Sequence, residues 1–255
     1  MRVLTLILAL LISLPIQAES RLPFLKGIAG DHELPLPWGI SFDFYTMDQQ
    51  YAIDRLEFSL PGVVLSDPSL LDVDNEIQHF DIKLDVWLFP FLNVFAIYGQ
   101  LDAETNVDIS RAMLPLPVNS FPVEYDGDVY GGGITLAGGG EHWFASLTAT
   151  FTDTSLDGGF DSSVESVTLQ PRIGINHGAW QYYIGGMHLD TEEKHSGIIT
   201  IPNIGVIPFG VDLSEEDEFN YAIGVHHMLS ERIEFSFEIG FGDRDHTLFN
   251  IGYRF

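Results

Sequence analysis

Histidines near carboxylates are the residues of this sequence that could carry catalysis. The candidates are His79, His188, His195 and His246, with Asp190, Asp243 and Asp245 close by in the sequence. A histidine with a carboxylate beside it could act as a general base that activates water or a hydroxyl nucleophile, which is the chemistry of a hydrolase. No motif orders these residues into a triad. We therefore predict no enzyme and no catalytic residues, and keep a hydrolase as the less favoured alternative.

The sequence predicts no metal centre and no cofactor. His226 and His227 are adjacent, and adjacent side chains of a strand point to opposite faces, so the pair does not chelate one ion. The acidic stretches 67–76 and 215–218 offer oxygen ligands for Ca²⁺ or Mg²⁺, but neither has the spacing of a defined calcium loop. Divalent cations at these acidic loops remain an open alternative as partners.

The charge of the chain excludes one large class of partner. Asp and Glu number 37 against 11 Lys and Arg, and the formal net charge is −26. Because affinity for phosphate backbones comes from Lys and Arg, we expect no nucleic-acid binding. The chain has no cysteine, so it forms no disulfides. The acidity fits either a need for solubility or attraction of cations to an anionic cell surface.

The elements that position these residues are expected to be strands. Apolar and polar residues alternate over runs of about ten residues. The clearest runs are His79–Leu88, His142–Phe151, Ser166–Ile175, Phe219–His227 and Ile233–Phe241. Strands of soluble β-sandwiches are usually shorter, about five or six residues. In lipid, every backbone donor and acceptor must pair internally, so a membrane sheet has to close. The pattern predicts an all-β fold: a transmembrane, antiparallel, up-and-down β-barrel.

Short and long connections alternate along the chain, as in barrels with short periplasmic turns and long extracellular loops. We expect strands near 76–88, 93–107, 127–137, 141–152, 163–175, 179–190, 217–228, 231–242 and 246–255. The stretch Trp38–Leu60 is ambiguous, because its apolar residues change parity between Phe44 and Tyr51. It forms either one long strand with a bulge near Gln49 or two strands. Bacterial barrels use an even number of strands, so we expect ten, or twelve if 191–217 or the N-terminal segment adds strands.

The two ends of the chain carry the strongest signals. Residues 1–18 have one cation, an apolar run and Ile16-Gln17-Ala18 before Glu19, which predicts a secretory signal peptide. The last strand places its aromatic and apolar residues on one face: Phe249, Ile251, Tyr253 and Phe255. This ending resembles the assembly signal of Gram-negative outer-membrane β-barrels. The resemblance implies the cell outer membrane as location, and lipid, lipopolysaccharide and the barrel-assembly machinery as partners.

A second resemblance covers about fifteen residues. The stretch Asp85–Gly99 is similar to a hairpin of uncharacterised, porin-like proteobacterial outer-membrane proteins, and implies no activity. Its aromatic residues Trp87, Phe89, Phe91 and Phe95 are expected to form a belt at the headgroups. We divide the chain into a signal peptide (1–18), a lead-in segment (19–37) and a barrel (38–255). The lead-in lies in the periplasm or enters the lumen.

The parity of the strands also predicts which residues line the lumen. Their shared feature is a polar side chain opposite an apolar face: Asp81, Lys83, Asp85, Asp102, Glu104, Gln170, Arg172, His226, Glu234, Glu238 and Arg254. A ten-stranded barrel is narrow enough for side chains to fill. Either the cations Lys83, Arg172 and Arg254 neutralise carboxylates in a packed core, or an acidic water-filled path prefers cations.

Three functional hypotheses follow. The first is a narrow porin-like channel or a passive structural barrel with an acidic lumen. The second is a surface binding or adhesion protein that acts through the long apolar loops 108–126 and 191–217. These loops could fold inward, pair as strands above the membrane, or bind a partner. The third is a lipid-modifying hydrolase at the outer rim.

Overall fold

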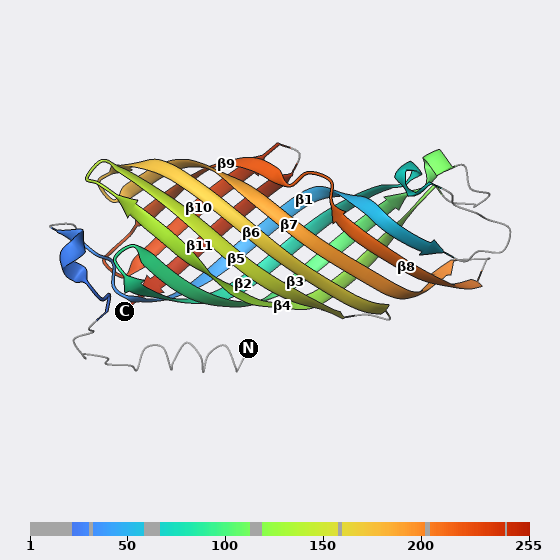
Figure 1. Ribbon diagram of the computed structural model, residues 1–255, viewed down its shortest axis with the longest axis horizontal. Coiled ribbons are helices and arrows are strands. Elements are labelled where there is room, and N and C mark those ends of the chain that lie inside the picture. Colours follow the sequence, from blue (N-terminus) through green and yellow to red (C-terminus); the bar gives the residue numbers. More distant parts are fainter. Residues whose placement is uncertain are drawn as a thin grey trace.

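The chain forms one closed antiparallel barrel, seen along its side in Figure 1. The computed structural model describes residues 22–30, 33–58, 67–112, 119–157, 160–201, 205–242 and 244–255. Its strands are β1 (Trp38–Phe58), β2 (Asp72–Phe89), β3 (Leu92–Asp108), β4 (Ser120–Gly139), β5 (Trp143–Asp157), β6 (Phe160–His177), β7 (Trp180–Ile201), β8 (Gly205–Glu215), β9 (Phe219–Met228), β10 (Ile233–Phe241) and β11 (Asp245–Arg254). Three short 3₁₀ helices complete it: η1 (Lys26–Ala29), η2 (Pro68–Leu70) and η3 (Ser110–Ala112). Among the described residues, no helix is long and apolar enough to cross a membrane.

Ten strands form the ring at the end of the barrel that carries the C-terminus. Neighbouring strands pair in chain order, except that β9 pairs with β7, and β11 closes the ring on β1. The closing register runs from Gly39 against Arg254 to Asp48 against Asp245. The predicted barrel of ten strands and its short turns on this side are therefore confirmed.

The stretch 191–217 is not a loop. Its first part extends β7 to Ile201, and its second part is β8. Strand β8 lies between β7 and β1, beyond the ends of β9, β10 and β11 on the side away from the C-terminus. A second ring, made of β1 to β8, therefore continues the wall beyond the ten-stranded ring. The stretch 108–126 likewise contributes the start of β4. Of the alternatives for the long loops, pairing as strands above the membrane is the one that forms.

The stretch Trp38–Leu60 contains one long strand, as the ten-stranded alternative required. Inward-facing residues keep one parity from Ser41 through Met47 and Gln49 to Tyr51, so no bulge occurs near Gln49. The register shifts only between Ile53 and Arg55, in the pairing with β8. The apolar residues change parity because the strand passes from one environment to another.

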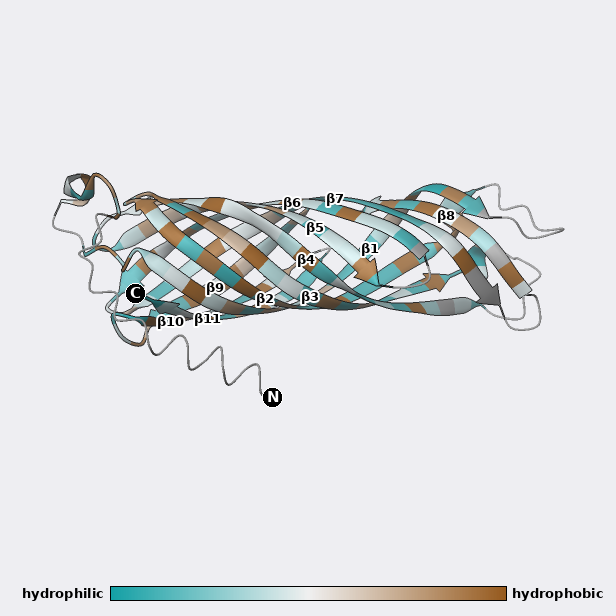
Figure 2. Ribbon diagram, turned by 90° about the horizontal axis from the view of Figure 1, so that it is seen from below, coloured by the Kyte–Doolittle hydropathy of each residue, from teal (hydrophilic) through white to brown (hydrophobic). Residues whose placement is uncertain are grey.

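An apolar band surrounds the ten-stranded ring. Phe44 on β1 lies opposite Phe80 on β2 and Phe249 on β11, and all three side chains are exposed. The aromatic rings of Phe44 and Phe80 are 4.9 Å apart. Below this level the outward residues of the three strands are apolar; above it they are polar, beginning with Thr46 and Gln78. Figure 2 shows the resulting alternation of brown and teal segments along the strands.

The eight-stranded ring has the opposite arrangement, with an apolar interior and a polar exterior. Two apolar clusters lie inside it beside buried polar side chains, one cluster built on Tyr51, Val73 and Leu213, the other on Leu101, Ala103 and Val129. Burial of apolar side chains away from water stabilises this half as it does a soluble protein. The barrel therefore has two halves with inverted polarity, and the boundary between them marks the outer edge of the apolar band.

The lead-in segment reaches the mouth beside the C-terminus. The backbone N–H of Phe24 donates to the carbonyl of Leu88 at 2.8 Å, and the guanidinium of Arg254 donates to the carbonyl of Leu36 at 2.9 Å. Helix η1 lies outside this mouth in Figure 1. The described part of this segment therefore lies at the mouth and not deep in the lumen, and its periplasmic location stays a prediction. The predicted signal peptide lies outside the described residues and stays a prediction.

Candidate functional site

A buried ion pair spans the lumen of the ten-stranded ring. Arg172 on β6 donates from Nε to Glu238 on β10 at 2.8 Å, and His246 on β11 lies 3.2 Å from the other carboxylate oxygen. The side chain of Glu238 is 2% exposed and that of His246 is fully buried. Since β6 and β10 are not neighbours in the sheet, this contact crosses the interior. It fills the lumen near the outer edge of the apolar band.

The other two lumen cations are also paired. Near the periplasmic mouth, Arg254 contacts Asp85 at 2.9 Å and Glu234 at 3.1 Å, and His226 lies 3.4 Å from Glu234. In the middle of the ring, Lys83 lies 3.7 Å from a carboxylate oxygen of Asp43. The three cations thus lie at three levels, each beside carboxylates. Such pairing is what the packed polar core, one of the two alternatives offered by the sequence, requires.

The structure places all but two of the proposed lumen residues on the inner face. Asp102 and Glu104 are the exceptions, because both are exposed on the outer face of β3. Asp102 pairs with Gln78 and Glu104 with Glu76, which are also exposed. Their position in the lumen was inferred by applying the rule of the membrane half, apolar outward and polar inward, to a segment that lies above it, where acidic residues face water. Phe95 also departs from the predicted belt: it lies inside, with the ammonium of Lys83 5.8 Å from its ring centre.

The junction between the two rings contains residues that the sequence did not single out. Arg244 is 1% exposed; it donates from Nε to Gln49 Oε1 at 2.9 Å and from Nη2 to the carbonyl of Asp217 at 2.6 Å. Burial lowers the pKa of its guanidinium. Asn220, which is fully buried, donates to the carbonyl of Arg244 at 3.0 Å and contacts His246 at 2.9 Å. Arg244 follows the β10–β11 turn, where no periodicity indicates which way a side chain points.

A polar network also crosses the eight-stranded ring. Tyr51 on β1 donates its hydroxyl to Glu193 on β7, and the second carboxylate oxygen of Glu193 lies 3.1 Å from His195 Nε2. The other ring nitrogen of His195 is 2.9 Å from the hydroxyl of Ser162 on β6. Burial, followed by the neighbouring carboxylate, raises the pKa of Tyr51 well above its usual range, so its hydroxyl remains protonated.

The histidines proposed for catalysis lie in four different settings. His195 belongs to this network, and His246 to the ion pair with Glu238. His79 faces the lumen 3.0 Å from Asp81, whereas His188 is exposed near Glu218. His226 and His227 point to opposite faces as expected, because His227 stacks on Trp180 at the outer surface.

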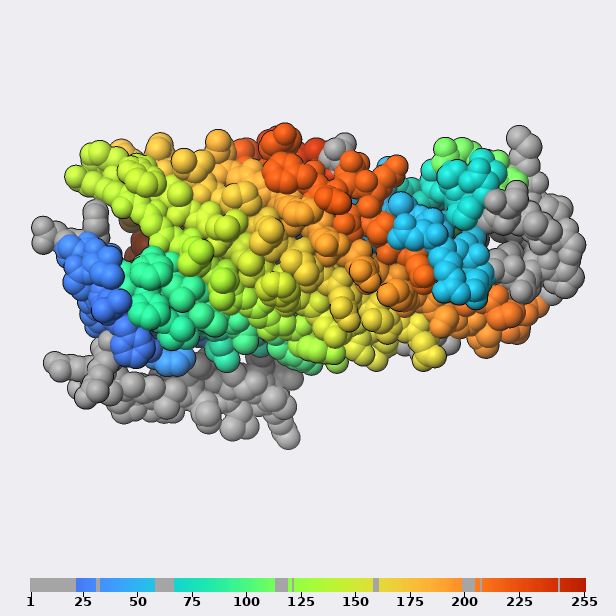
Figure 3. Space-filling view, viewed as in Figure 1, coloured from blue at the N-terminus to red at the C-terminus, as the bar shows by residue number. Residues whose placement is uncertain are grey.

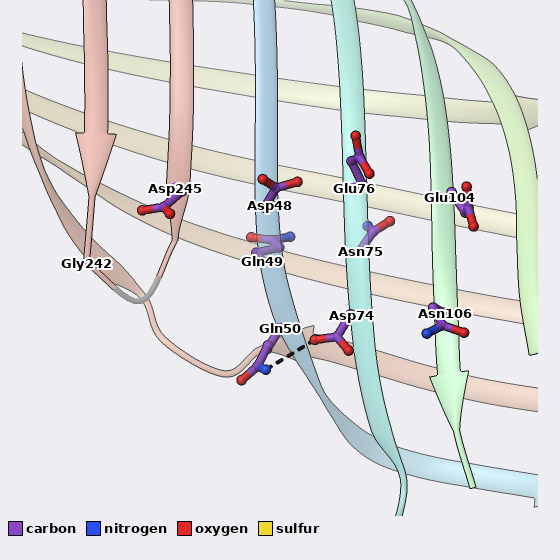
Figure 4. Close-up of a pocket in the computed structure, with 10 residues that line it drawn as sticks. All are labelled: Asp48, Gln49, Gln50, Asp74, Asn75, Glu76, Glu104, Asn106, Gly242 and Asp245. Atoms are coloured by element: carbon purple, nitrogen blue, oxygen red, sulfur yellow. Dashed lines mark hydrogen bonds between the residues drawn. The ribbon is translucent and has the colours of Figure 1, made fainter. Parts of the chain in front are cut away.

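A hollow of about 550 Å³ lies where β10 and β11 end beside β1. Figure 4 shows its carboxylates on neighbouring strands: Asp48, Asp74, Glu76, Glu104 and Asp245. Gln50 donates to Asp74 at 3.1 Å. Among the residues that the structure describes, no group of three or more acidic or histidine side chains is arranged to hold a metal ion. Five carboxylates give this surface a strong negative potential above the apolar band.

A closed sheet with an apolar exterior and a paired polar interior matches a hydrocarbon environment, because exposed charge is costly there. It is a membrane-spanning β-barrel. No protein-family model and no curated protein sequence matches the barrel.

Solved structures with a similar course of the chain include outer membrane proteins and the transport unit of an autotransporter. The outer membrane protein OprG from Pseudomonas aeruginosa is 12% identical over 88% of this chain and 98% of that one, with a TM-score of 0.48. The transport unit of the autotransporter AIDA-I from Escherichia coli is 9% identical over 89% and 92%, with a TM-score of 0.45. The COG4313 outer membrane channel from Pseudomonas putida F1 is 11% identical over 89% and 98%, with a TM-score of 0.37. Sequence identities and TM-scores this low allow no inference about function.

Proposed function

We propose that the protein is a passive outer-membrane barrel whose lumen is shut by its own side chains, and which holds a rigid acidic extension above the membrane. The observation that carries this proposal is the contact of Arg172 with Glu238 across the lumen. Pairing of Lys83 with Asp43 and of Arg254 with Asp85 supports it, since each of these lumen cations lies beside a carboxylate that neutralises it. The apolar clusters of the eight-stranded ring, together with the hydrogen-bonded side chains of Tyr51, Glu193 and His195, add a second packed layer. The wall visible in Figure 3 is likewise continuous along β4 to β8.

Planar-bilayer recording of the refolded protein tests the proposal. We expect no conductance steps above the background of protein-free membranes in concentrated KCl, because the ion pair and the apolar clusters block the path at two levels. The Arg172→Ser/Glu238→Ser variant serves as the comparison and is expected to stay closed, since the apolar clusters remain. Cation-selective steps from the wild-type protein would reject the passive barrel in favour of the narrow channel.

A surface-binding role is the second candidate, and the tip of the β7–β8 hairpin favours it. Ile198 and Val206 are each 62% exposed at the extracellular end of the barrel. An apolar pair at such a tip is a contact site for a partner rather than part of a core. Deleting the hairpin would be a poor test, because β8 pairs with β1 and closes the upper ring.

The Ile198→Asn/Val206→Asn variant tests surface binding without opening the barrel. We expect at least a tenfold loss of binding of whole cells to a host-cell or abiotic surface, measured as retained cells under flow, because each buried side chain is worth about 1.5–3 kcal/mol. The Lys194→Gln variant, on the outer face of the same strand, is the matched control. Equal retention of all three strains would count against binding through this tip.

The positions of the apolar band and of the acidic exterior also suggest partners in the membrane. We propose that membrane lipid surrounds the apolar band, that lipopolysaccharide borders the acidic exterior, and that divalent cations reduce the repulsion between the two. We further propose that the barrel-assembly machinery reads the strand with Phe249, Ile251, Tyr253 and Phe255, whose first three side chains are exposed on the outer face.

A further inference from the structure

The polar network of the eight-stranded ring has the parts of a hydrolytic centre. Ser162 Oγ lies 2.9 Å from His195 Nδ1, and His195 Nε2 lies 3.1 Å from Glu193 Oε2. Hydroxyl, imidazole and carboxylate in that order form a nucleophile, its general base and the group that orients the base. The sequence could not indicate this order, because Ser162 and His195 are brought together only by the pairing of β6 with β7.

The tautomer of His195 is set by its neighbours. Glu193 accepts hydrogen bonds only, so His195 Nε2 carries the proton and Nδ1 is left to accept the proton of Ser162. Tyr51 donates to the other oxygen of Glu193 and fixes the carboxylate in place. Since the Glu193 side chain is 6% exposed and the His195 side chain 10% exposed, their interaction strengthens when His195 becomes charged. These features favour proton transfer from Ser162.

The surroundings indicate what kind of molecule could enter. Ser162 is half-buried and, like His195, borders a hollow of about 450 Å³ between β1, β6, β7 and β8. On the inner face, His195 lies opposite Val211, which packs with Ile53 against the Tyr51 cluster. Most of the other residues that line this hollow are charged or hydroxyl-bearing, among them Arg55, Asp161 and Lys194. A polar, water-accessible lining beside a nucleophile suits an ester with a short acyl chain.

We propose that Ser162, His195 and Glu193 form a serine esterase centre in the extracellular half of the barrel. Ser162 Oγ bonds to the carbonyl carbon of the ester while its proton passes to His195. The bond from that carbon to the alcohol oxygen breaks, and the alcohol leaves with the proton from His195. Water then loses a proton to His195 and bonds to the acyl carbon. The carboxylic acid leaves, and the proton returns to Ser162.

A fluorophosphonate probe tests the proposal on the full-length protein in detergent. We expect a covalent adduct on Ser162, located by mass spectrometry, together with hydrolysis of p-nitrophenyl acetate. His195→Gln should slow both by about 10²–10⁴-fold, the usual contribution of a general base. Ser162→Ala should abolish the adduct. Retention of the heat-sensitive gel shift of a folded barrel shows that each variant is folded.

Ser166→Ala is the matched control. Ser166 lies on the same inner face of β6, but its hydroxyl contacts Thr191 at 3.1 Å instead of a histidine. This variant should be labelled at the wild-type rate. Folded wild-type protein that gives no adduct, or equal labelling of the wild type and Ser162→Ala, would overturn the proposal and leave the network a structural one.

Discussion

Glu238→Met is expected to lower the free energy of unfolding by about 3–5 kcal/mol, because it leaves the Arg172 guanidinium buried without its carboxylate. The same substitution removes the acceptor at 3.2 Å from His246, which is fully buried. Arg172→Met should be destabilising for the reciprocal reason. Equilibrium unfolding in urea, followed by tryptophan fluorescence in detergent micelles, measures both losses.

The double variant Arg172→Met/Glu238→Met distinguishes a lost pair from an orphaned charge. Replacement of both partners by apolar residues of similar volume is often neutral, so most of the stability should return. Lys83→Met is the matched control: its ammonium lies 3.7 Å from Asp43 and its side chain is 30% exposed, so a smaller loss is expected. Single and double variants with equal losses would show that Arg172 and Glu238 do not act as a pair.

Leu84→Arg should destabilise the barrel by about 2–4 kcal/mol, whereas Asp102→Arg should leave its stability within about 0.5 kcal/mol. Both residues lie on the outer face, on neighbouring strands. Leu84, 56% exposed, lies within the apolar band, while Asp102 lies above it, where water surrounds the side chain. Folding of each variant into lipid vesicles, monitored by protease protection and urea titration, measures the difference.

The outcome for Asp102→Arg also tests the correction made by the structure. If Asp102 lined the lumen, as its parity suggested, arginine there would contact the packed interior and disrupt folding. A loss similar to that of Leu84→Arg would therefore place the boundary of the apolar band higher on β3 than the polarity of its residues indicates.

The sequence was sufficient for the features that depend on local alternation. The membrane strands, the short turns between them and the inward position of Lys83, Arg172, Glu238 and Arg254 follow from the two-residue period of a strand and its interruptions. A charged residue flanked by apolar neighbours in a membrane strand has only one face available, since the other meets hydrocarbon. That rule does not depend on which strands are neighbours.

The alternation of polar and apolar residues does not show how far along the barrel axis a residue lies. Asp102 and Glu104 share the parity rule with Asp81 and Asp85 but lie above the apolar band, where the polarity of the two faces is reversed. The same reversal explains why the apolar residues change parity between Phe44 and Tyr51, which in the sequence suggested a bulge. Only the register of β1 with β2 and β11 shows that one straight strand crosses the boundary.

By itself, then, the amino-acid order determined a β-barrel with an apolar band and an acidic surface. The tertiary structure alone decided that β8 closes a second ring, that Arg244 reaches the junction, and that Ser162 meets His195. Strand neighbours and turn geometry depend on closure of the whole sheet, in which each register is fixed by all the others. Contacts between residues on different strands are therefore settled when the ring closes, and no local pattern records them.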